Sequence, residues 1–110
     1  MSKVYLANAF SLSMLSRDEA IIRVREVSVS EAANVLSQGF ISAVGHESTA
    51  QLLTQLLSIP VPVNRIQIRL EPGDKLVVFQ LLTRLPEGKV LTLEELKTIQ
   101  YKLYLVVIVQ

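Results

Sequence analysis

KLYLVVIV, residues Lys102–Val109, is the stretch that decides the fold of this chain. It is nearly continuously apolar and is far shorter than the roughly 20 residues that a membrane-spanning helix needs. A run of this kind is typical of a strand that is buried on both faces. We therefore expect it to lie in the centre of a sheet or at a subunit contact, and we expect no contact with a membrane.

Three shorter stretches toward the N-terminus are also predicted strands. Lys3–Ala7 is β-branched and aromatic, Ala20–Val27 alternates like a half-exposed strand, and Phe40–Val44 is a brief apolar run. Asn8–Leu15 mixes polar and apolar residues, so we expect a loop or a short helix after the first strand.

A hairpin is predicted in the second half of the chain. Apolar and polar residues alternate in Asn64–Leu70, which places Ile66 and Ile68 toward the core. Pro72-Gly73-Asp74 then supplies turn residues ahead of the apolar run Lys75–Leu82. We expect these two runs to pair with each other.

Two helices are predicted between the strands. Ser28 or Ser30 is expected to begin a short helix that ends before Gly39. Ser48 and Gln51 have the spacing of a capping box, which predicts a second helix. Four residues of that helix recur at helical spacing and form its apolar face: Leu52, Leu53, Leu56 and Leu57.

Residues 1–110 are predicted to form one small domain of the α+β class. A chain of 110 residues has room for a single hydrophobic core. Thr92 and Glu95 form another capping box ahead of the last strand. The pattern as a whole predicts a mixed sheet of five or six strands with helices packed against it.

Composition excludes several classes of function. A net charge of +1 is too balanced for a domain that binds long nucleic acids by neutralising many phosphates. The chain has no cysteine and one histidine, which argues against a transition-metal site. We expect no metal and no cofactor, and any phosphate binding must be local.

His46 is the strongest candidate for chemistry. Histidine is the side chain best suited to exchange protons near neutral pH, and this one follows Gly45 at a predicted strand-to-helix turn. The helix start at Ser48 and Thr49 offers free amides and a positive dipole end, which attract a phosphate. An exposed loop histidine beside an ordinary capped helix fits the same pattern.

Two arginines are further candidates. Arg84 lies just past a predicted strand, close to Glu87, where a guanidinium can bind a phosphate through two hydrogen bonds. Arg65 is expected to face away from the core of its strand. An ordinary solvated arginine and a surface salt bridge, respectively, explain these residues equally well.

Three uncharged polar residues complete the candidates. Gln80 interrupts an apolar run, so it needs either a pocket or a backbone partner. Asn8 and Ser11 follow the first predicted strand, where sheet proteins often place ligand contacts. Both residues are equally suited to cap a short helix.

Four segments together resemble the viral ring nucleases, anti-CRISPR enzymes that degrade the cyclic tetra-adenylate messenger of type III CRISPR defence. The segments cover about half of the chain and are VYLANAFSLSML (Val4–Leu15), AVGHESTAQLL (Ala43–Leu53), VNRIQIRLEPGDKLVVFQL (Val63–Leu81) and RLPEGKVLTLEEL (Arg84–Leu96). The resemblance implies bacterial and proviral relatives and a cytoplasmic protein, in the host cytoplasm if it is viral. It also implies a homodimer that encloses one cyclic tetra-adenylate at its interface, because both have twofold symmetry.

The resemblance further implies a metal-independent mechanism and a role for each candidate. In that family a ribose 2′-hydroxyl attacks the neighbouring phosphate, and a histidine matched by His46 protonates the departing 5′-oxygen. The products are linear di-adenylates with 2′,3′-cyclic phosphate ends. By position, Arg84 holds the reacting phosphate, while Glu87 and Ser11 support the same site. Four residues are expected to line the binding pocket: Asn8, Ser48, Arg65 and Gln80.

Two other functions are compatible with the sequence. A non-catalytic sponge would sequester the cyclic nucleotide in the same pocket without cleaving it. A nucleic-acid-binding accessory protein of a virus or mobile element would need a basic face or aromatic platforms. Three Phe, three Tyr and no Trp, together with the charge balance, argue against the latter.

Overall fold

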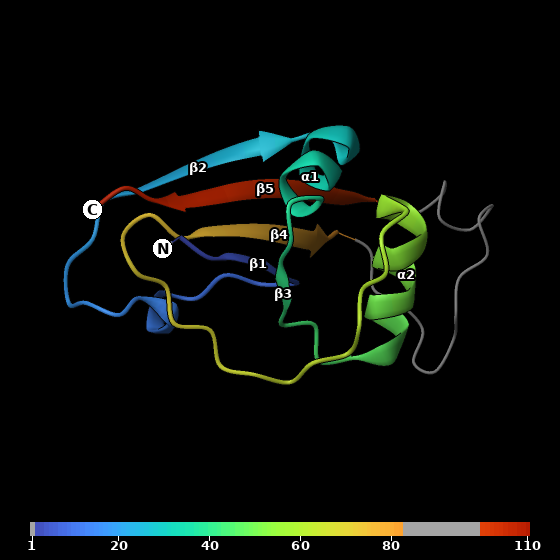
Figure 1. The fold of residues 1–110 in the computed structure, drawn as a ribbon, viewed down its shortest axis with the longest axis horizontal. Coiled ribbons are helices and arrows are strands. Elements are labelled where there is room, and N and C mark those ends of the chain that lie inside the picture. The colour runs from blue at the N-terminus through green and yellow to red at the C-terminus, as the bar shows by residue number, and fades with distance from the viewer. Residues whose placement is uncertain (1, 83–99) are drawn as a thin grey trace.

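A computed structural model describes residues 2–82 and 100–110 of the chain. Within these residues it contains one five-stranded sheet, two α-helices and one short 3-10 helix, which confirms the predicted α+β class (Figure 1). The strands are β1 (Val4–Ala7), β2 (Ile22–Val27), β3 (Ile41–Ser42), β4 (Lys75–Leu81) and β5 (Tyr101–Ile108). The helices are the 3-10 helix η1 (Leu12–Met14), α1 (Val29–Leu36) and α2 (Glu47–Leu57).

β5 lies inside the sheet, as its apolar sequence predicts. The strand order is β2-β5-β4-β1-β3, so β5 pairs on both sides, antiparallel to β2 and to β4. β1 is parallel to its neighbours β4 and β3, which makes the sheet mixed. The two outermost strands are β2 and β3.

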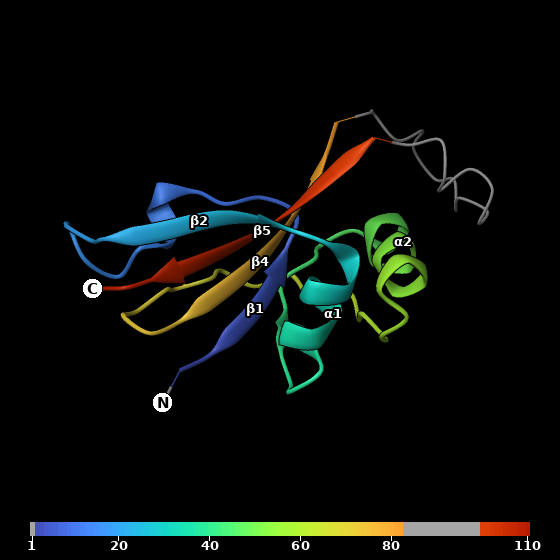
Figure 2. The ribbon, with the colours of Figure 1, turned by 90° about the horizontal axis from the view of Figure 1, so that it is seen from above.

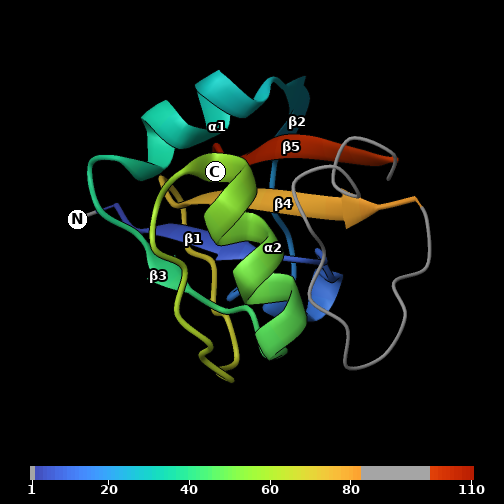
Figure 3. The same cartoon turned by 90° about the vertical axis from the view of Figure 1, so that its right-hand side faces the viewer.

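Both α-helices cover the same face of the sheet (Figure 2). Ser28 caps α1, since its hydroxyl accepts a hydrogen bond from the Glu31 amide. The predicted apolar face of α2 is confirmed, with Leu52, Leu53 and Leu57 buried among sheet residues. Figure 3 shows α2 in front of the strands.

The opposite face of the sheet carries a second apolar cluster, which two irregular segments cover in part. Met14 and Leu15 pack on it from the first segment, and Ile68 and Leu70 belong to it from the second. The segments hold each other, because the Leu70 amide donates to the Met14 carbonyl and the Ser16 amide donates to the Leu70 carbonyl. Residues of β2, β4 and β5 beyond these segments remain accessible.

The predicted hairpin between Asn64–Leu70 and Lys75–Leu82 is wrong. β4 pairs with β1 and β5, so its two edges are already occupied. The chain at residues 62–69 is extended but belongs to no strand, and Ile66 is 42% exposed whereas Ile68 is 8% exposed. The predicted turn does form, with Gly73 at a φ of 93° and the Asp74 amide donating to the Glu71 carbonyl.

The predicted capping box at Ser48 and Gln51 is also wrong. α2 begins two residues earlier than the box requires, with His46 at the N-cap position and without a side-chain cap. Gln51 instead donates from Nε2 to the Glu47 carboxylate at 3.2 Å. Thr92 and Glu95 lie outside the described residues. None of the helices within residues 2–82 and 100–110 is long and apolar enough to cross a bilayer.

Candidate functional site

His46 lies on an open hollow next to the end of β1. The hollow has a volume of about 540 Å³, and it joins residues from three parts of the chain. Its lining is Asn8, Ala43, Gly45, His46, Arg65, Ile66 and Gln67. The structure therefore brings together three of the predicted site residues, His46, Arg65 and Asn8, which lie far apart in the sequence.

Arg65 is tied to the loop that carries His46. Its Nε donates to the Gly45 carbonyl at 2.8 Å. The side chain is exposed, and this hydrogen bond does not use the two terminal guanidinium nitrogens. A Cβ placed on Gly45 would lie 3.1 Å from the Arg65 Cγ, so glycine permits this close approach. Residues 62–69, which do not form the predicted hairpin, thus place Arg65 next to the start of α2.

The start of α2 supplies the predicted helix N-terminus. The His46 carbonyl accepts the Ala50 amide at 3.0 Å, and Ser48 lies half-buried in the first turn. Ser48 does not line the hollow at His46. Its neighbour Thr49 lines a smaller hollow together with Asn8 and Gln80.

Asn8 is the residue that connects these hollows. It follows the last residue of β1, its side chain is exposed, and it lines both the hollow at His46 and the one at Thr49. Because β1 lies between β3 and β4, its end is flanked by the loop that leads to His46 and by the end of β4, where Gln80 lies.

Gln80 is exposed, so its amide is not a buried group that lacks a partner. It opposes Lys102 in the β4–β5 register, on the accessible face of the sheet. Of the two environments expected for it, the structure provides the pocket: Gln80 lines a hollow with Asn8.

Ser11 takes the capping role that its position also predicted. Its Oγ accepts from the Ser13 amide at 3.3 Å and contacts the Ser13 Oγ at 2.9 Å, at the start of η1. Ser11 is exposed and does not line the hollow at His46. Arg84 and Glu87 lie outside the described residues, so their catalytic roles stay predictions.

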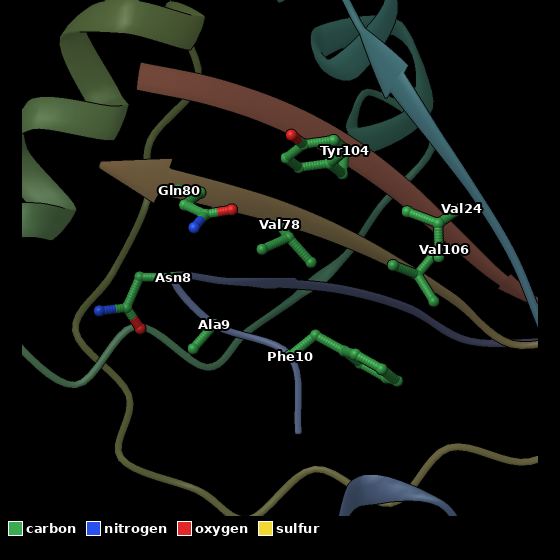
Figure 4. Close-up of a pocket in the computed structure, with 8 residues that line it drawn as sticks. All are labelled: Asn8, Ala9, Phe10, Val24, Val78, Gln80, Tyr104 and Val106. Carbon is green, nitrogen blue, oxygen red and sulfur yellow. The ribbon is translucent and has the colours of Figure 1, made fainter. Parts of the chain in front are cut away.

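Several pocket residues were not predicted from the sequence. Gln67 and Ala43 line the hollow at His46, and Phe10 and Tyr104 line the hollow at Gln80. Tyr104 opposes Val78 in the β4–β5 register. Side chains alternate between the two faces of β4 and β5, so the sequence could have shown that Val78, Gln80 and Tyr104 share a face (Figure 4). That inference needs the β4–β5 pairing, which the sequence analysis did not predict.

Metal-binding residues do not gather in the part of the chain that the structure describes. No group of three or more His, Cys, Asp or Glu side chains is close enough there to hold an ion. The expected absence of a metal remains a prediction.

The sequence pattern of the STIV B116-like family matches residues 4–103. The chain belongs to this family. The solved structure of B116 of Sulfolobus turreted icosahedral virus has the same fold, with a TM-score of 0.88 and 30% sequence identity. The similarity covers 96% of this chain and 99% of B116.

Relatives of this STIV B116-like chain come from viruses and from a bacterium. Protein 26 of Sulfolobus islandicus filamentous virus is 45% identical, over 93% of this chain and 88% of its own length. ORF117 of Acidianus two-tailed virus is 38% identical, over 97% of this chain and 94% of its own length. YddF of Bacillus subtilis is 31% identical, over 88% of this chain and 93% of its own length. The viral matches support the viral origin that the ring-nuclease resemblance implies.

Proposed function

We propose that this STIV B116-like protein is a metal-independent ring nuclease that cleaves cyclic tetra-adenylate to linear di-adenylates with 2′,3′-cyclic phosphate ends. It acts as a homodimer in the cytoplasm and counters type III CRISPR signalling. The observation that supports this proposal best is the hollow at the end of β1, where His46 and Arg65 lie together with Asn8. A proton donor and a phosphate-binding cation therefore share one accessible site.

The protein does not have to supply the nucleophile for this reaction, because the attacking hydroxyl belongs to the substrate. A ribose 2′-hydroxyl attacks the adjacent phosphorus and loses its proton to solvent water, the bond to the 5′-oxygen breaks, and that oxygen takes up a proton from the general acid. Holding the two oxygens in line and stabilising charge on the phosphate account for much of the catalysis. A general acid adds roughly two to four powers of ten in rate.

The three candidate residues that line the hollow at His46 each have a part in this reaction. His46 donates the proton to the departing 5′-oxygen. The terminal nitrogens of Arg65 bind a phosphate oxygen while its Nε keeps the Gly45 carbonyl, so one side chain sets the position of both phosphate and loop. Asn8 orients the nucleotide through its amide. Arg84 and Glu87 are proposed to complete the site around the reacting phosphate.

Product analysis tests the proposal directly. The purified protein is incubated with cyclic tetra-adenylate in excess chelator, and the products are identified by liquid chromatography and mass spectrometry. Linear di-adenylates with cyclic phosphate ends are expected, together with a dimer mass by light scattering. Tight binding with no product after long incubation would show a sponge and refute the enzyme.

A further inference from the structure

Arg65 reaches the loop of His46 because the segment that carries it lies along the end of β3 and the loop that follows. Residues 62–65 and residues 42–45 are joined at successive points by hydrogen bonds. The last of these runs from the Arg65 Nε to the Gly45 carbonyl. By itself it holds a long, exposed side chain weakly, because water competes for both groups and a free arginine has many rotamers. The position of Arg65 therefore depends on what fixes its backbone.

Asn64, the residue before Arg65, is bonded to that loop through both its backbone and its side chain. Its amide donates to the Val44 carbonyl at 2.8 Å, and its Nδ2 donates to the Ser42 carbonyl at 2.7 Å. Asn64 is half-buried, so water competes less for these bonds than for the one at Arg65. Together the two bonds set both the place and the direction of the chain that enters Arg65.

The residues that accept these bonds are themselves firmly held. Val44 is fully buried in the core, and Ser42 is 4% exposed. The Ser42 Oγ accepts from the Val44 amide at 3.3 Å and donates to the Pro62 carbonyl at 2.6 Å. Asn64 is therefore held against a buried part of the fold, which gives the exposed arginine beside it a fixed reference.

From these contacts we propose that Asn64 is a positioning residue, whose side-chain amide holds the Arg65 guanidinium beside His46. Asn64 does not line the hollow at His46, so it acts through Arg65 rather than on a ligand. Its effect on cleavage rests on the proposed function, whereas its effect on Arg65 does not. Reaction rates are sensitive to such placement, since a shift of about 1 Å can cost roughly a hundredfold.

Two substitutions of Asn64 remove the side-chain bond alone. Asn64→Ala keeps the backbone bond to Val44, so the variant is expected to fold. Asn64→Asp keeps the size of the side chain but has only acceptor atoms, which cannot donate to the Ser42 carbonyl. It takes the place of Asn64→Ala if that variant does not fold. Asn34→Ala, which removes an exposed carboxamide on α1, is the matched control.

The first measurement needs no substrate. The Arg65 Nε–H signal is identified in NMR spectra by its absence from Arg65→Ala. In Asn64→Ala this group should exchange with solvent several-fold faster than in the native protein, because its hydrogen bond to Gly45 opens more often. In Asn34→Ala the exchange rate should equal the native one. A folded Asn64→Ala with the native exchange rate overturns the assignment.

The second measurement is single-turnover cleavage of cyclic tetra-adenylate at saturation. Asn64→Ala should be slower than the native protein by about fivefold, because Arg65 is displaced but still present, while the Kd for the ring changes less than about twofold. In an Arg65→Ala background, Asn64→Ala should cause no further loss of rate, since the residue that it positions is gone. A role in stability alone predicts a lower Tm with the native rate in the folded variant, and that result, or equal losses in both backgrounds, overturns the assignment.

The outcomes separate this inference from the proposed function. If the native protein never cleaves cyclic tetra-adenylate, the nuclease is refuted, and faster exchange of the Arg65 Nε–H in Asn64→Ala still supports the positioning role. If the native protein cleaves and Asn64→Ala keeps both the native rate and the native exchange, the nuclease stands and the positioning role is refuted.

Discussion

Replacing Asp74 by alanine should destabilise the protein strongly. The Asp74 side chain is 3% exposed, and its two carboxylate oxygens accept the Lys3 amide at 2.9 Å and the Glu71 amide at 3.0 Å. A hydrogen bond to a charged group contributes about 1.5–3 kcal/mol, and water can replace part of it here because Lys3 and Glu71, which donate the bonds, are exposed residues. We therefore expect Asp74→Ala to lower the free energy of unfolding by about 2–4 kcal/mol.

Asp74 holds one end of the β1–β4 pair, whose other end lies at the candidate site. The Lys3 amide lies at the start of β1, and the register pairs Val4 with Lys75 beside Asp74. The far ends of the same two strands carry Asn8 and Gln80.

Urea denaturation at neutral pH, followed by circular dichroism, measures the change for Asp74→Ala. For a domain of this size it corresponds to a drop in Tm of roughly 10 °C. Asp74→Asn keeps one acceptor and should lose about half as much stability. Asp18→Ala removes an exposed carboxylate and serves as the control. If Asp74→Ala and Asp18→Ala differ by less than about 0.5 kcal/mol, the two hydrogen bonds do not hold the turn as described.

Three other variants test the surroundings of the site and the helix start. Arg65→Ala should slow single-turnover cleavage by at least about tenfold, whereas Arg69→Ala, also exposed on the same segment, should be nearly silent; equal losses would indicate only diffuse electrostatics. Gly45→Ala should slow cleavage several-fold with little loss of stability, because the Arg65 Cγ lies 3.1 Å from the new Cβ and must move; an unchanged rate would contradict the coupling. The hydrogen bond from Arg25 lowers the pKa of the Glu31 carboxyl, so the contribution of this pair is present above the ordinary pKa of glutamate and is lost as the pH falls through the lowered value. NMR titration of Arg25→Ala should show the pKa of Glu31 rising back toward its ordinary value, and a pKa that stays low would assign the effect to Ser28.

Local sequence patterns predicted the elements better than their pairing. The continuous apolar run of β5 predicted a strand in the centre of the sheet or at a subunit contact, and the strand lies inside the sheet. Of the two expected starts of α1, Ser28 and Ser30, Ser28 is the N-cap. The alternation of apolar and polar residues in Asn64–Leu70 is typical of a strand, so the sequence predicted a hairpin with the next run. β4 pairs instead with β1 and β5, which are distant in the sequence. Hydrogen bonds to Val44 and Met14 hold this segment in an extended form outside the sheet.

Site residues could be predicted from the sequence where the residue type alone indicates a function. They could not be predicted where their place in the site depends on which segments pack together in the fold. His46 stood out as the single histidine at a turn before a helix, and the structure places it at that turn. The exposure of Gln80 depends on which face of β4 the helices cover. The contact of Arg65 with Gly45 depends on a segment packing alongside a loop twenty residues earlier, which no local pattern reveals.

The most direct test of the proposed function is single-turnover cleavage of cyclic tetra-adenylate by His46→Ala, with chelator present and the variant saturated with substrate. His46 is exposed at the start of α2 and its side chain makes no cap, so the variant should fold and still bind the ring. We expect its cleavage rate to be lower than that of the native protein by roughly two to four powers of ten, the contribution of a general acid. A correctly folded, saturated His46→Ala that cleaves within a few-fold of the native rate would contradict acid catalysis by this histidine.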